Sequence, residues 1–276
     1  MPQQQGSADA RGSTGAVQAP RAPNRLFTLL EAPRASMELG SLVAAAPILL
    51  TAPRGDGDPV LVLAGLSGGS GWTAVLRCYL RSLGHAVYAP RFAATKGSSG
   101  RVRRLLAERV DELAERHGGA VSVIGWSVGG CTARQVAAAR PDNIRQIVTL
   151  GTPLDGRWYP EGHRQAAGPL DVPVTAIVSR TDGTFQWRRC LQPGSSRAEN
   201  VQVVSSHLGM ATNPLVYHVI ADRLGQPEGS WRPYAAGRPN ARGADRPSAA
   251  RPARAPGTTP DVPLPGRRGS RVGRAR

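Results

Sequence analysis

Residues 121–130 read VSVIGWSVGG, and this stretch decides the fold class. The apolar and small residues before Gly125 predict a buried strand, and the alanine-rich residues 131–140 predict a helix directly after it. Between the two, the backbone must reverse within a few residues, so Ser127 is forced into a strained conformation and its neighbours must be small. Gly125 and Gly129 meet that demand. A serine at the tip of such a strand–turn–helix unit is typical of a nucleophile.

An oxyanion beside such a serine needs two hydrogen-bond donors. The amide of Val128 lies at the start of the predicted helix, where unpaired backbone N–H groups favour negative charge. The second donor normally comes from the loop after an early strand. Residues 59–64 predict that strand, and the sequence GLSGGSG follows at 65–71 with four glycines in seven residues. We assign the second donor to the amide of Leu66, with Ser67 as the alternative.

The candidate acid and base follow two later strands. Residues 173–179 form a β-branched run that predicts a buried parallel strand, and Asp182 lies on the loop after it. His207 lies just past the next predicted strand, residues 200–205. Because the carboxyl ends of parallel strands meet at one edge of a sheet, we expect Ser127, Asp182 and His207 to converge there.

Competing residues fit this pattern less well. Asp171 precedes its strand and is expected at the opposite edge, whereas Asp155 follows the preceding strand and stays open as an alternative acid. The remaining histidines are expected at a strand start, a helix end, a polar loop and inside the last helix, in the order His85, His117, His163 and His218.

The three preferred residues have complementary chemistry. A serine hydroxyl attacks a carbonyl carbon, and a histidine takes its proton and returns it to the leaving group. A carboxylate orients the imidazole and stabilises its charged form. We therefore expect Ser127 as nucleophile, His207 as base and Asp182 as acid.

Strands alternate with helices along the rest of the chain. The apolar positions of residues 100–117 recur at helical spacing, which predicts an amphipathic helix that covers a sheet. Residues 144–150 predict a further strand. This alternation indicates an α/β fold, with a mostly parallel sheet and helices on both faces. The other expected elements are helices at 72–83 and 215–224, a strand at 85–89 and a helix within 39–50.

Taken in order, these motifs resemble the α/β-hydrolase superfamily, and most closely its bacterial esterase- and lipase-like members. The resemblance implies hydrolysis of a carboxylic ester or thioester without a cofactor, with Ser127, Asp182 and His207 in the roles given above. Many members have histidine or proline before the first glycine of the oxyanion loop, and here that position is Ala64. The resemblance covers residues 30–235, and it rests on residues 60–71, 125–130, 149–153, 179–183 and 206–209.

The cover of the substrate pocket is expected to be small. Only some twenty residues lie between Thr152 and Pro173, with glycine, proline, arginine and histidine among them, which favours a minimal lid over a large hydrophobic one. Trp126, beside the nucleophile, and Trp187, after the acid, are candidates to wall an acyl pocket. The same edge would gain further surface from Leu66, Ser67 and Met210.

The ends of the chain differ from the catalytic domain, which we expect over residues 26–236. Residues 1–25 and the tail 237–276 have compositions typical of disorder. The tail holds ten arginines, two aspartates and seven prolines, so half of the net charge of +16 lies in it. Such a tail can bind nucleic acid or an anionic surface, although compositional bias explains it more simply.

The chain has three cysteines, Cys78, Cys131 and Cys190, without metal-ligand spacing. We expect no metal and no cofactor, and we expect Cys131 to be a small buried residue. The first residues lack the charged and apolar regions of a secretory leader, and the most apolar stretch, 39–50, is too short to span a bilayer. We therefore expect a cytoplasmic protein.

These patterns favour a serine hydrolase that cleaves carboxylic esters through an acyl-enzyme intermediate. The expected partner is a small-molecule or lipid-like ester. Acyl transfer or thioester cleavage by the same residues stays an alternative, as does a non-catalytic relative that only binds ligands.

Overall fold

The computed structural model describes residues 23–65, 71–90, 100–154 and 168–234. The two expected disordered ends lie almost entirely outside these ranges, as do most of the oxyanion loop and most of the segment expected to form a minimal lid.

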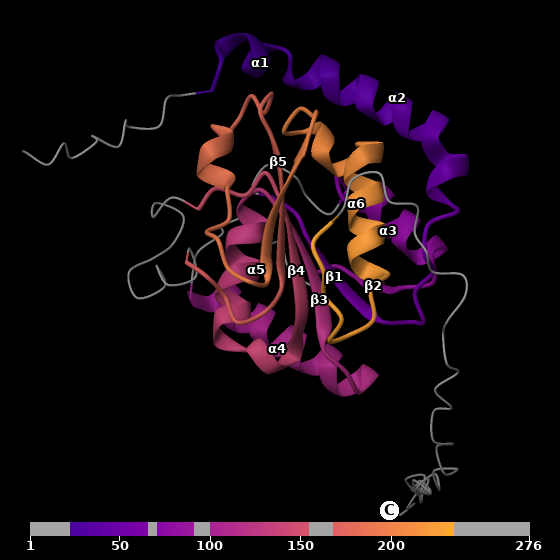
Figure 1. Ribbon diagram of the computed structural model, residues 1–276, viewed down its shortest axis with the longest axis vertical. Coiled ribbons are helices and arrows are strands. Elements are labelled where there is room, and N and C mark those ends of the chain that lie inside the picture. Colours follow the sequence, from indigo (N-terminus) through magenta and orange to yellow (C-terminus); the bar gives the residue numbers. More distant parts are fainter. Residues whose placement is uncertain (1–22, 66–70, 91–99, 155–167, 235–276) are drawn as a thin grey trace, which may run out of the picture. The chain divides into compact units, whose positions relative to one another are not determined.

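A six-stranded parallel sheet forms the centre of the described structure (Figure 1). Its strand order is β2-β1-β3-β4-β5-β6, so the chain crosses back over β1 once, after β2, and then proceeds outward from β3. The order reverses between β1 and β3, and ligands bind at the carboxyl ends of strands at such a point. The strands are Pro59–Leu63 (β1), Ala86–Tyr88 (β2), Val121–Trp126 (β3), Ile144–Leu150 (β4), Val174–Ser179 (β5) and Ala198–Val203 (β6).

Alternate residues of the strands pack into two cores, one on each face of the sheet. In β1, Val60 and Val62 join one core, and Leu61 and Leu63 join the other, as the period of two in a strand requires. The first core is covered by α3 (Ala74–Ser82) and α6 (Pro214–Leu224), and the second by α4 (Gly100–His117) and α5 (Val128–Ala139). The predicted α/β architecture, with helices on both faces, is therefore confirmed.

Element boundaries agree closely with the sequence patterns, with one shift. The helix predicted at 100–117 and the strand at 144–150 have the predicted limits. The last strand, β6, begins and ends two residues earlier than predicted, because Val174 of β5 pairs with Ala198 and sets the register. Cys131 in α5 is buried, as expected.

The structure differs most from the sequence prediction near the amino-terminal end, where two helices are found in place of the short one expected within 39–50. They are α1 (Arg25–Leu29) and α2 (Glu31–Leu49), and they run over the carboxyl ends of the strands (Figure 1). Gly40 and Pro47 do not break α2, although each disfavours a helix. Leu42 and Leu49 are buried in the first core, and this packing outweighs the local preference.

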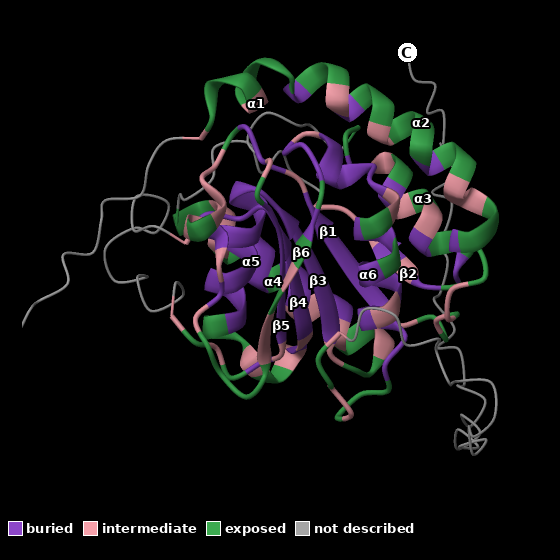
Figure 2. Ribbon diagram, turned by 45° about the horizontal axis from the view of Figure 1, so that its top comes forward, coloured by how far each residue is buried: buried purple, intermediate pink, exposed green. Residues whose placement is uncertain are grey.

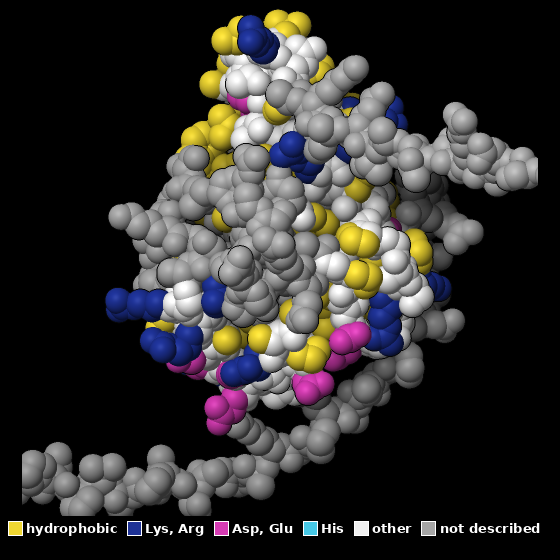
Figure 3. All heavy atoms as spheres, turned by 90° about the vertical axis from the view of Figure 1, so that its left-hand side faces the viewer, with side chains coloured by type: hydrophobic (Ala, Val, Ile, Leu, Met, Phe, Trp, Pro, Cys, Tyr) yellow, Lys and Arg dark blue, Asp and Glu magenta, His cyan; other side chains and the backbone are white. Residues whose placement is uncertain are grey.

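The outer face of α2 is apolar, and its charged side chains turn inward. Glu31 is buried, and Arg34 and Glu38 are half-buried. Figure 2 shows the exposed outer face of the helix, and Figure 3 shows hydrophobic side chains gathered over α1 and α2. Within the described ranges, no helix is both long and apolar enough to cross a membrane. The exposed apolar side chains of α2 include Met37 at 74%, Val43 at 72% and Ile48 at 72%.

Candidate active site

Ser127 lies at the tight turn between β3 and α5. Its φ is 57° and its ψ is −130°, and among the described residues it is the one non-glycine residue with a positive φ. A side chain in this region costs conformational energy, which persists only where the surroundings fix it. Here the amide of Ser127 donates to Leu150 O at 2.8 Å, and its carbonyl accepts from Gly130 N at 3.0 Å. The predicted strained serine is therefore present.

Small residues allow this turn to pack, as its sequence pattern predicted. A Cβ on Gly125 would lie 2.4 Å from Gly130 Cα, and one on Gly129 would lie 2.6 Å from Ala64 O. Neither position can hold a larger residue without moving backbone. Thr152, at the end of β4, adds a hydrogen bond from its Oγ1 to Ser127 O at 2.9 Å.

One of the two predicted oxyanion donors can be placed. Val128 is the first residue of α5, so its amide belongs to the helix start, where N–H groups have no partner within the helix. The loop after β1 begins beside the nucleophile, since a Cβ on Gly65 would lie 3.3 Å from Ser127 Oγ. Leu66 and Ser67, the predicted second donor and its alternative, lie outside the described residues.

The candidate acid and base contact each other directly. His207 Nδ1 and Asp182 Oδ2 are 2.8 Å apart, and the two residues are only 3% and 4% exposed. The second carboxylate oxygen, Oδ1, accepts the amides of Thr184 at 2.8 Å and Phe185 at 2.7 Å. These bonds fix the carboxylate with one oxygen toward the imidazole, which leaves Nε2 as the ring nitrogen able to exchange a proton with a nucleophile.

The loop after β5, residues 180–185, is called the acid loop below, and residues 204–209 are called the base loop. The turn between β3 and α5, which contains Ser127, is called the nucleophile turn. Trp126 lies at the start of this turn and contacts the base loop. Its Nε1 donates to His207 O at 3.1 Å, its ring lies 5.8 Å from the imidazole, and Ser127 follows it directly. The structure thus brings the end of β3 next to the acid–base pair.

Gly151, just after β4, lies beneath the acid–base pair. Its φ is 52°, and a Cβ there would lie 3.0 Å from Asp182 Oδ2, His207 Nδ1 and the sulfur of Met210. Met210, one of the predicted pocket residues, is therefore a fully buried neighbour of the pair. Its place is in the floor of the site.

The aromatic surroundings differ in part from the predicted pocket. Trp126 is almost completely buried and contacts His207, whereas the ring of Trp187 contacts the guanidinium groups of Arg180 and Arg188, at 5.0 and 4.8 Å from its centre. The ring that packs edge-on against His207, at 5.1 Å, belongs to Phe185. The sequence analysis did not single out Phe185, although its place three residues after Asp182 could have suggested it.

The competing residues have other surroundings. His85 packs against Gly55, His117 bonds to Tyr88 Oη at 2.8 Å, and His218 is exposed on α6. Asp171 precedes β5, at the opposite edge of the sheet from Asp182. Asp155 and His163 lie outside the described residues.

Three residues of α2 complete the site, and sequence reasoning missed them. Glu31, Arg34 and Glu38 hydrogen-bond to the acid loop or the base loop. Their spacing of three and four residues places them on one face of a helix, and that pattern could have indicated a polar contact with the rest of the chain.

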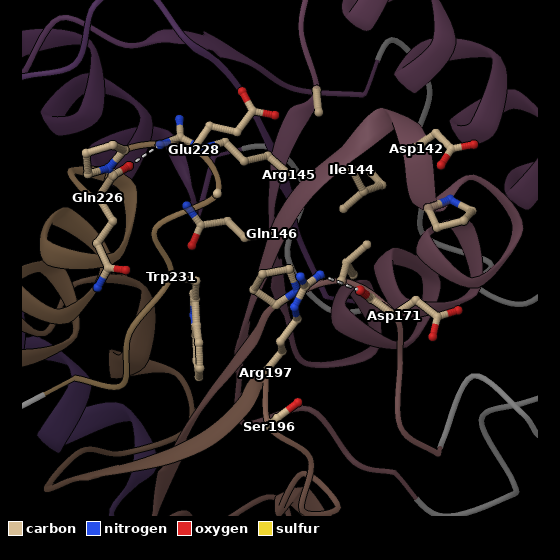
Figure 4. Close-up of a pocket in the computed structure, with 16 residues that line it drawn as sticks. Asp142, Ile144, Arg145, Gln146, Asp171, Ser196, Arg197, Gln226, Glu228 and Trp231 are labelled. Carbon is tan, nitrogen blue, oxygen red and sulfur yellow. Dashed lines mark hydrogen bonds between the residues drawn. The ribbon is translucent and has the colours of Figure 1, made fainter.

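A separate cavity of about 780 Å³ lies at the opposite edge of the sheet, near the amino ends of β4 and β5 (Figure 4). Its arginines are already bonded within the protein. Arg145 pairs with Asp58 at 2.8 Å, and Arg197 donates to Asp171 O at 3.3 Å. The cavity contains no member of the acid–base pair and lies away from Ser127, so the candidate chemistry belongs to the carboxyl edge.

Comparison with known proteins agrees with this fold. The alpha/beta hydrolase fold family matches residues 58–171. Triacylglycerol lipases from Pseudarthrobacter phenanthrenivorans and Burkholderia plantarii are 35% and 34% identical over 110 residues, which is 37% of this chain and 34% and 31% of those proteins. The crystal structure of Aspergillus fumigatus lipase B superimposes with a TM-score of 0.53 at 17% identity, over 63% of this chain and 54% of that one.

The described chain has the alpha/beta hydrolase fold, and residues 58–171 match the family of that name. The matching family region contains the nucleophile turn but ends before Asp182 and His207. The chain spans about a third of the length of the two bacterial lipases. The substrate class of those lipases therefore supports only a proposal about the substrate of this protein.

Proposed function

We propose that this protein is a serine hydrolase that cleaves carboxylic esters without a cofactor. The observation that carries the proposal is the buried hydrogen bond of 2.8 Å between His207 Nδ1 and Asp182 Oδ2, at the same edge of the sheet as Ser127 with its positive φ. Hydrolytic triads use this arrangement of acid, base and strained nucleophile. The similarity to triacylglycerol lipases supports an ester as the substrate class.

The first step forms an acyl-enzyme. Ser127 Oγ attacks the carbonyl carbon of the ester while its proton passes to His207 Nε2. Asp182 holds the imidazole and stabilises its protonated form. The amide of Val128 stabilises the negative charge on the carbonyl oxygen, with Leu66 as the proposed second donor. The tetrahedral intermediate collapses, the C–O bond to the alcohol breaks, and His207 returns the proton to the departing alcohol.

The second step releases the acid. A water molecule gives its proton to His207 and attacks the acyl carbon, and the bond to Ser127 Oγ then breaks as the serine regains the proton. The net reaction adds one water and yields an alcohol and a carboxylic acid. No electron transfer is involved.

The proposal is tested by labelling the purified protein with a fluorophosphonate probe, which reacts with activated serines. We expect the wild type to be labelled, Ser127→Ala to be unlabelled, and His207→Ala to be labelled at least 100-fold more slowly because the base is lost. A panel of nitrophenyl esters then gives the preferred acyl length. A folded wild type that resists the probe and cleaves no ester in the panel would contradict the proposal.

The cytoplasmic location stays a prediction, which fractionation of cells that produce the protein would test. The same holds for nucleic acid or anionic-surface binding by residues 237–276, which a salt-dependent binding assay with the full chain would measure.

A further inference from the structure

Helix α2 contacts both the acid loop and the base loop from outside the region that matches the hydrolase family. Glu31 makes the central contacts. Its Oε1 accepts the amides of Gly183 at 2.7 Å and His207 at 2.9 Å, and its Oε2 accepts the amide of Leu208 at 2.8 Å. One carboxylate therefore binds the residue after the candidate acid and the candidate base itself.

The acid loop is held on both sides of Asp182. Arg34 donates to the carbonyl of Thr181 at 2.6 Å and to its Oγ1 at 2.7 Å. Thr28, in α1, donates to the carbonyl of Gly183 at 2.6 Å. The backbone of the loop is thus fixed immediately before and after the carboxylate that orients His207.

The base loop is held in a similar way. Glu38 accepts the amide of Ser206 at 2.7 Å and the side-chain amide of Asn213 at 3.2 Å, and it also accepts the hydroxyl of Ser205. With the two bonds from Glu31, the backbone amides of residues 206, 207 and 208 all donate to carboxylates of one helix.

Two glycines in the predicted motifs fit this contact. A Cβ on Gly183 would lie 2.5 Å from the backbone of Phe27 in α1, and a Cβ on Gly209 would lie 2.0 Å from Glu38 Oε2. The loops can therefore approach the helices this closely only because these positions lack side chains. The surfaces of the two loops and the amino-terminal helices match in shape as well as in hydrogen bonding.

The burial of Glu31 points to a role in the site. Glu31 is only 7% exposed, and removing a carboxylate from water costs free energy unless hydrogen-bond donors replace the lost hydration. Three backbone amides supply those donors, and hydrogen bonds to an ionised acceptor are among the stronger ones. A misplacement of about 1 Å in a catalytic group can lower a rate by about 10²-fold. A carboxylate that ties two loops together is suited to prevent such movement.

We propose that Glu31 is a positioning residue, which holds the acid loop and the base loop in register so that Asp182 binds His207 and His207 faces Ser127. This inference rests on the proposed serine hydrolase function. Glu31 acts through the backbone of residues 183, 207 and 208 and does not itself touch the substrate.

The test compares Glu31→Ala and Glu31→Gln with Leu42→Ala, a control on the same helix. Leu42 is buried in the core and anchors α2 without a polar contact to either loop. In Glu31→Ala we expect kcat and the rate of fluorophosphonate labelling to fall about 10- to 100-fold, with KM changed less than about twofold. In Glu31→Gln we expect kcat and the labelling rate to lie between those of the wild type and Glu31→Ala, because the glutamine keeps one carbonyl oxygen as an acceptor. Leu42→Ala should melt at a lower temperature and keep its kcat.

A second measurement does not depend on turnover. The proton shared by Asp182 and His207 should give a low-field proton NMR signal in the wild type and in Leu42→Ala. In Glu31→Gln we expect this signal to broaden or weaken, because the two loops are less firmly held. If Glu31→Ala does not fold, the kinetic and NMR measurements on Glu31→Gln still test the inference.

The outcomes separate the inference from the proposed function. Wild-type labelling that is lost in Ser127→Ala supports the function, and wild-type rates in both Glu31 variants would then overturn only the role of Glu31. Equal losses of kcat in Glu31→Ala and Leu42→Ala would also overturn it, since the helix would then act as general support. A wild type without labelling or esterase activity would overturn the function and this inference together.

Discussion

At the scale of single residues, the site depends on positions where the backbone adopts a positive φ. Ser127 carries this strain at the nucleophile turn, and Gly151 adopts a φ of 52° directly beneath the acid–base pair. The strain at Ser127 is offset by the hydrogen bond that its amide donates to Leu150 in β4 and by the one that its carbonyl accepts from Gly130 in α5, so the backbone of the serine is fixed by its surroundings. Gly151 serves a different purpose, because the absence of its side chain makes room for Asp182, His207 and Met210.

Gly151→Ala is therefore expected to reduce activity more than stability. The added methyl group would lie 3.0 Å from Asp182 Oδ2 and His207 Nδ1 and push the pair apart. We expect kcat for a nitrophenyl ester to fall at least about 10-fold and the free energy of unfolding to fall by about 1–2 kcal/mol from the left-handed backbone. The measurements are steady-state kinetics and urea unfolding.

Gly118→Ala is the matched control. Gly118 has a φ of 63°, but a Cβ there has open space around it, and it follows α4. We expect Gly118→Ala to lower the free energy of unfolding about as much as Gly151→Ala does and to leave kcat unchanged. Equal activity in the two variants would show that the space beneath the acid–base pair is not needed.

At the scale of elements, the acid loop and the base loop are shaped by the helices that cover them. Helix α2 turns its charged side chains toward the loops and leaves Met37, Val43 and Ile48 exposed, whereas an ordinary surface helix exposes its charged side chains. Its amino-terminal half contacts the loops, and Leu42 and Leu49 anchor the rest in the core. At its carboxyl end, Tyr79 of α3 donates to Leu49 O at 3.1 Å, and burial raises the pKa of this phenol to about 12.

Gly183→Ala is expected to loosen α1 and the start of α2. Its methyl group would lie 2.5 Å from the backbone of Phe27, where a side chain cannot be moved aside. We expect a loss of about 1–3 kcal/mol in the free energy of unfolding, as for other overpacked sites, and faster hydrogen exchange in residues 25–35. Gly194→Ala, which adds the same methyl group in open space, should leave the exchange unchanged. Exchange that is equally slow in both variants would contradict the tight contact between the acid loop and α1.

At the scale of the whole molecule, the amino edge of the sheet makes folding sensitive to acid. His85 is buried beside Gly55 at the start of β2, and neither ring nitrogen has a hydrogen-bond partner among the described residues. Burial lowers the pKa of this imidazole, an effect that Arg145 reinforces and that Asp58 and Asp56 oppose. The folded protein thus binds a proton at His85 less readily than the unfolded chain does.

The free energy of unfolding is therefore expected to fall as the pH drops below about 6.5, the ordinary pKa of histidine. In that range the unfolded chain gains a proton at His85 before the folded protein does, so acid favours unfolding; above it the imidazole is neutral in both states. In His85→Phe this part of the acid sensitivity should disappear. Urea unfolding at pH 7.5 and pH 5.5 measures the difference, with His218→Gln as a control for the loss of an exposed imidazole. Identical pH dependence in wild type and His85→Phe would contradict the prediction.

The sequence by itself determined the sheet, the nucleophile turn and the choice of candidate residues. A period of two in β1, a helical period in α4 and small residues around Ser127 are local constraints, and each can be recognised within a short segment. The convergence of Asp182 and His207 followed from topology, because the carboxyl ends of parallel strands share one edge. Phe185 beside His207 was not predicted, since ring packing depends on the path of the acid loop.

Only the tertiary structure decided the role of the amino-terminal helices. Helix α2 contains one glycine and two prolines and lacks an ordinary amphipathic pattern, so its sequence suggested only a short helix within 39–50. Its length comes from core packing at Leu42 and Leu49, and the orientation of Glu31 comes from amides more than 150 residues away in the chain. Hydrogen bonds between such distant residues form only in the folded chain, so no local sequence pattern can predict them.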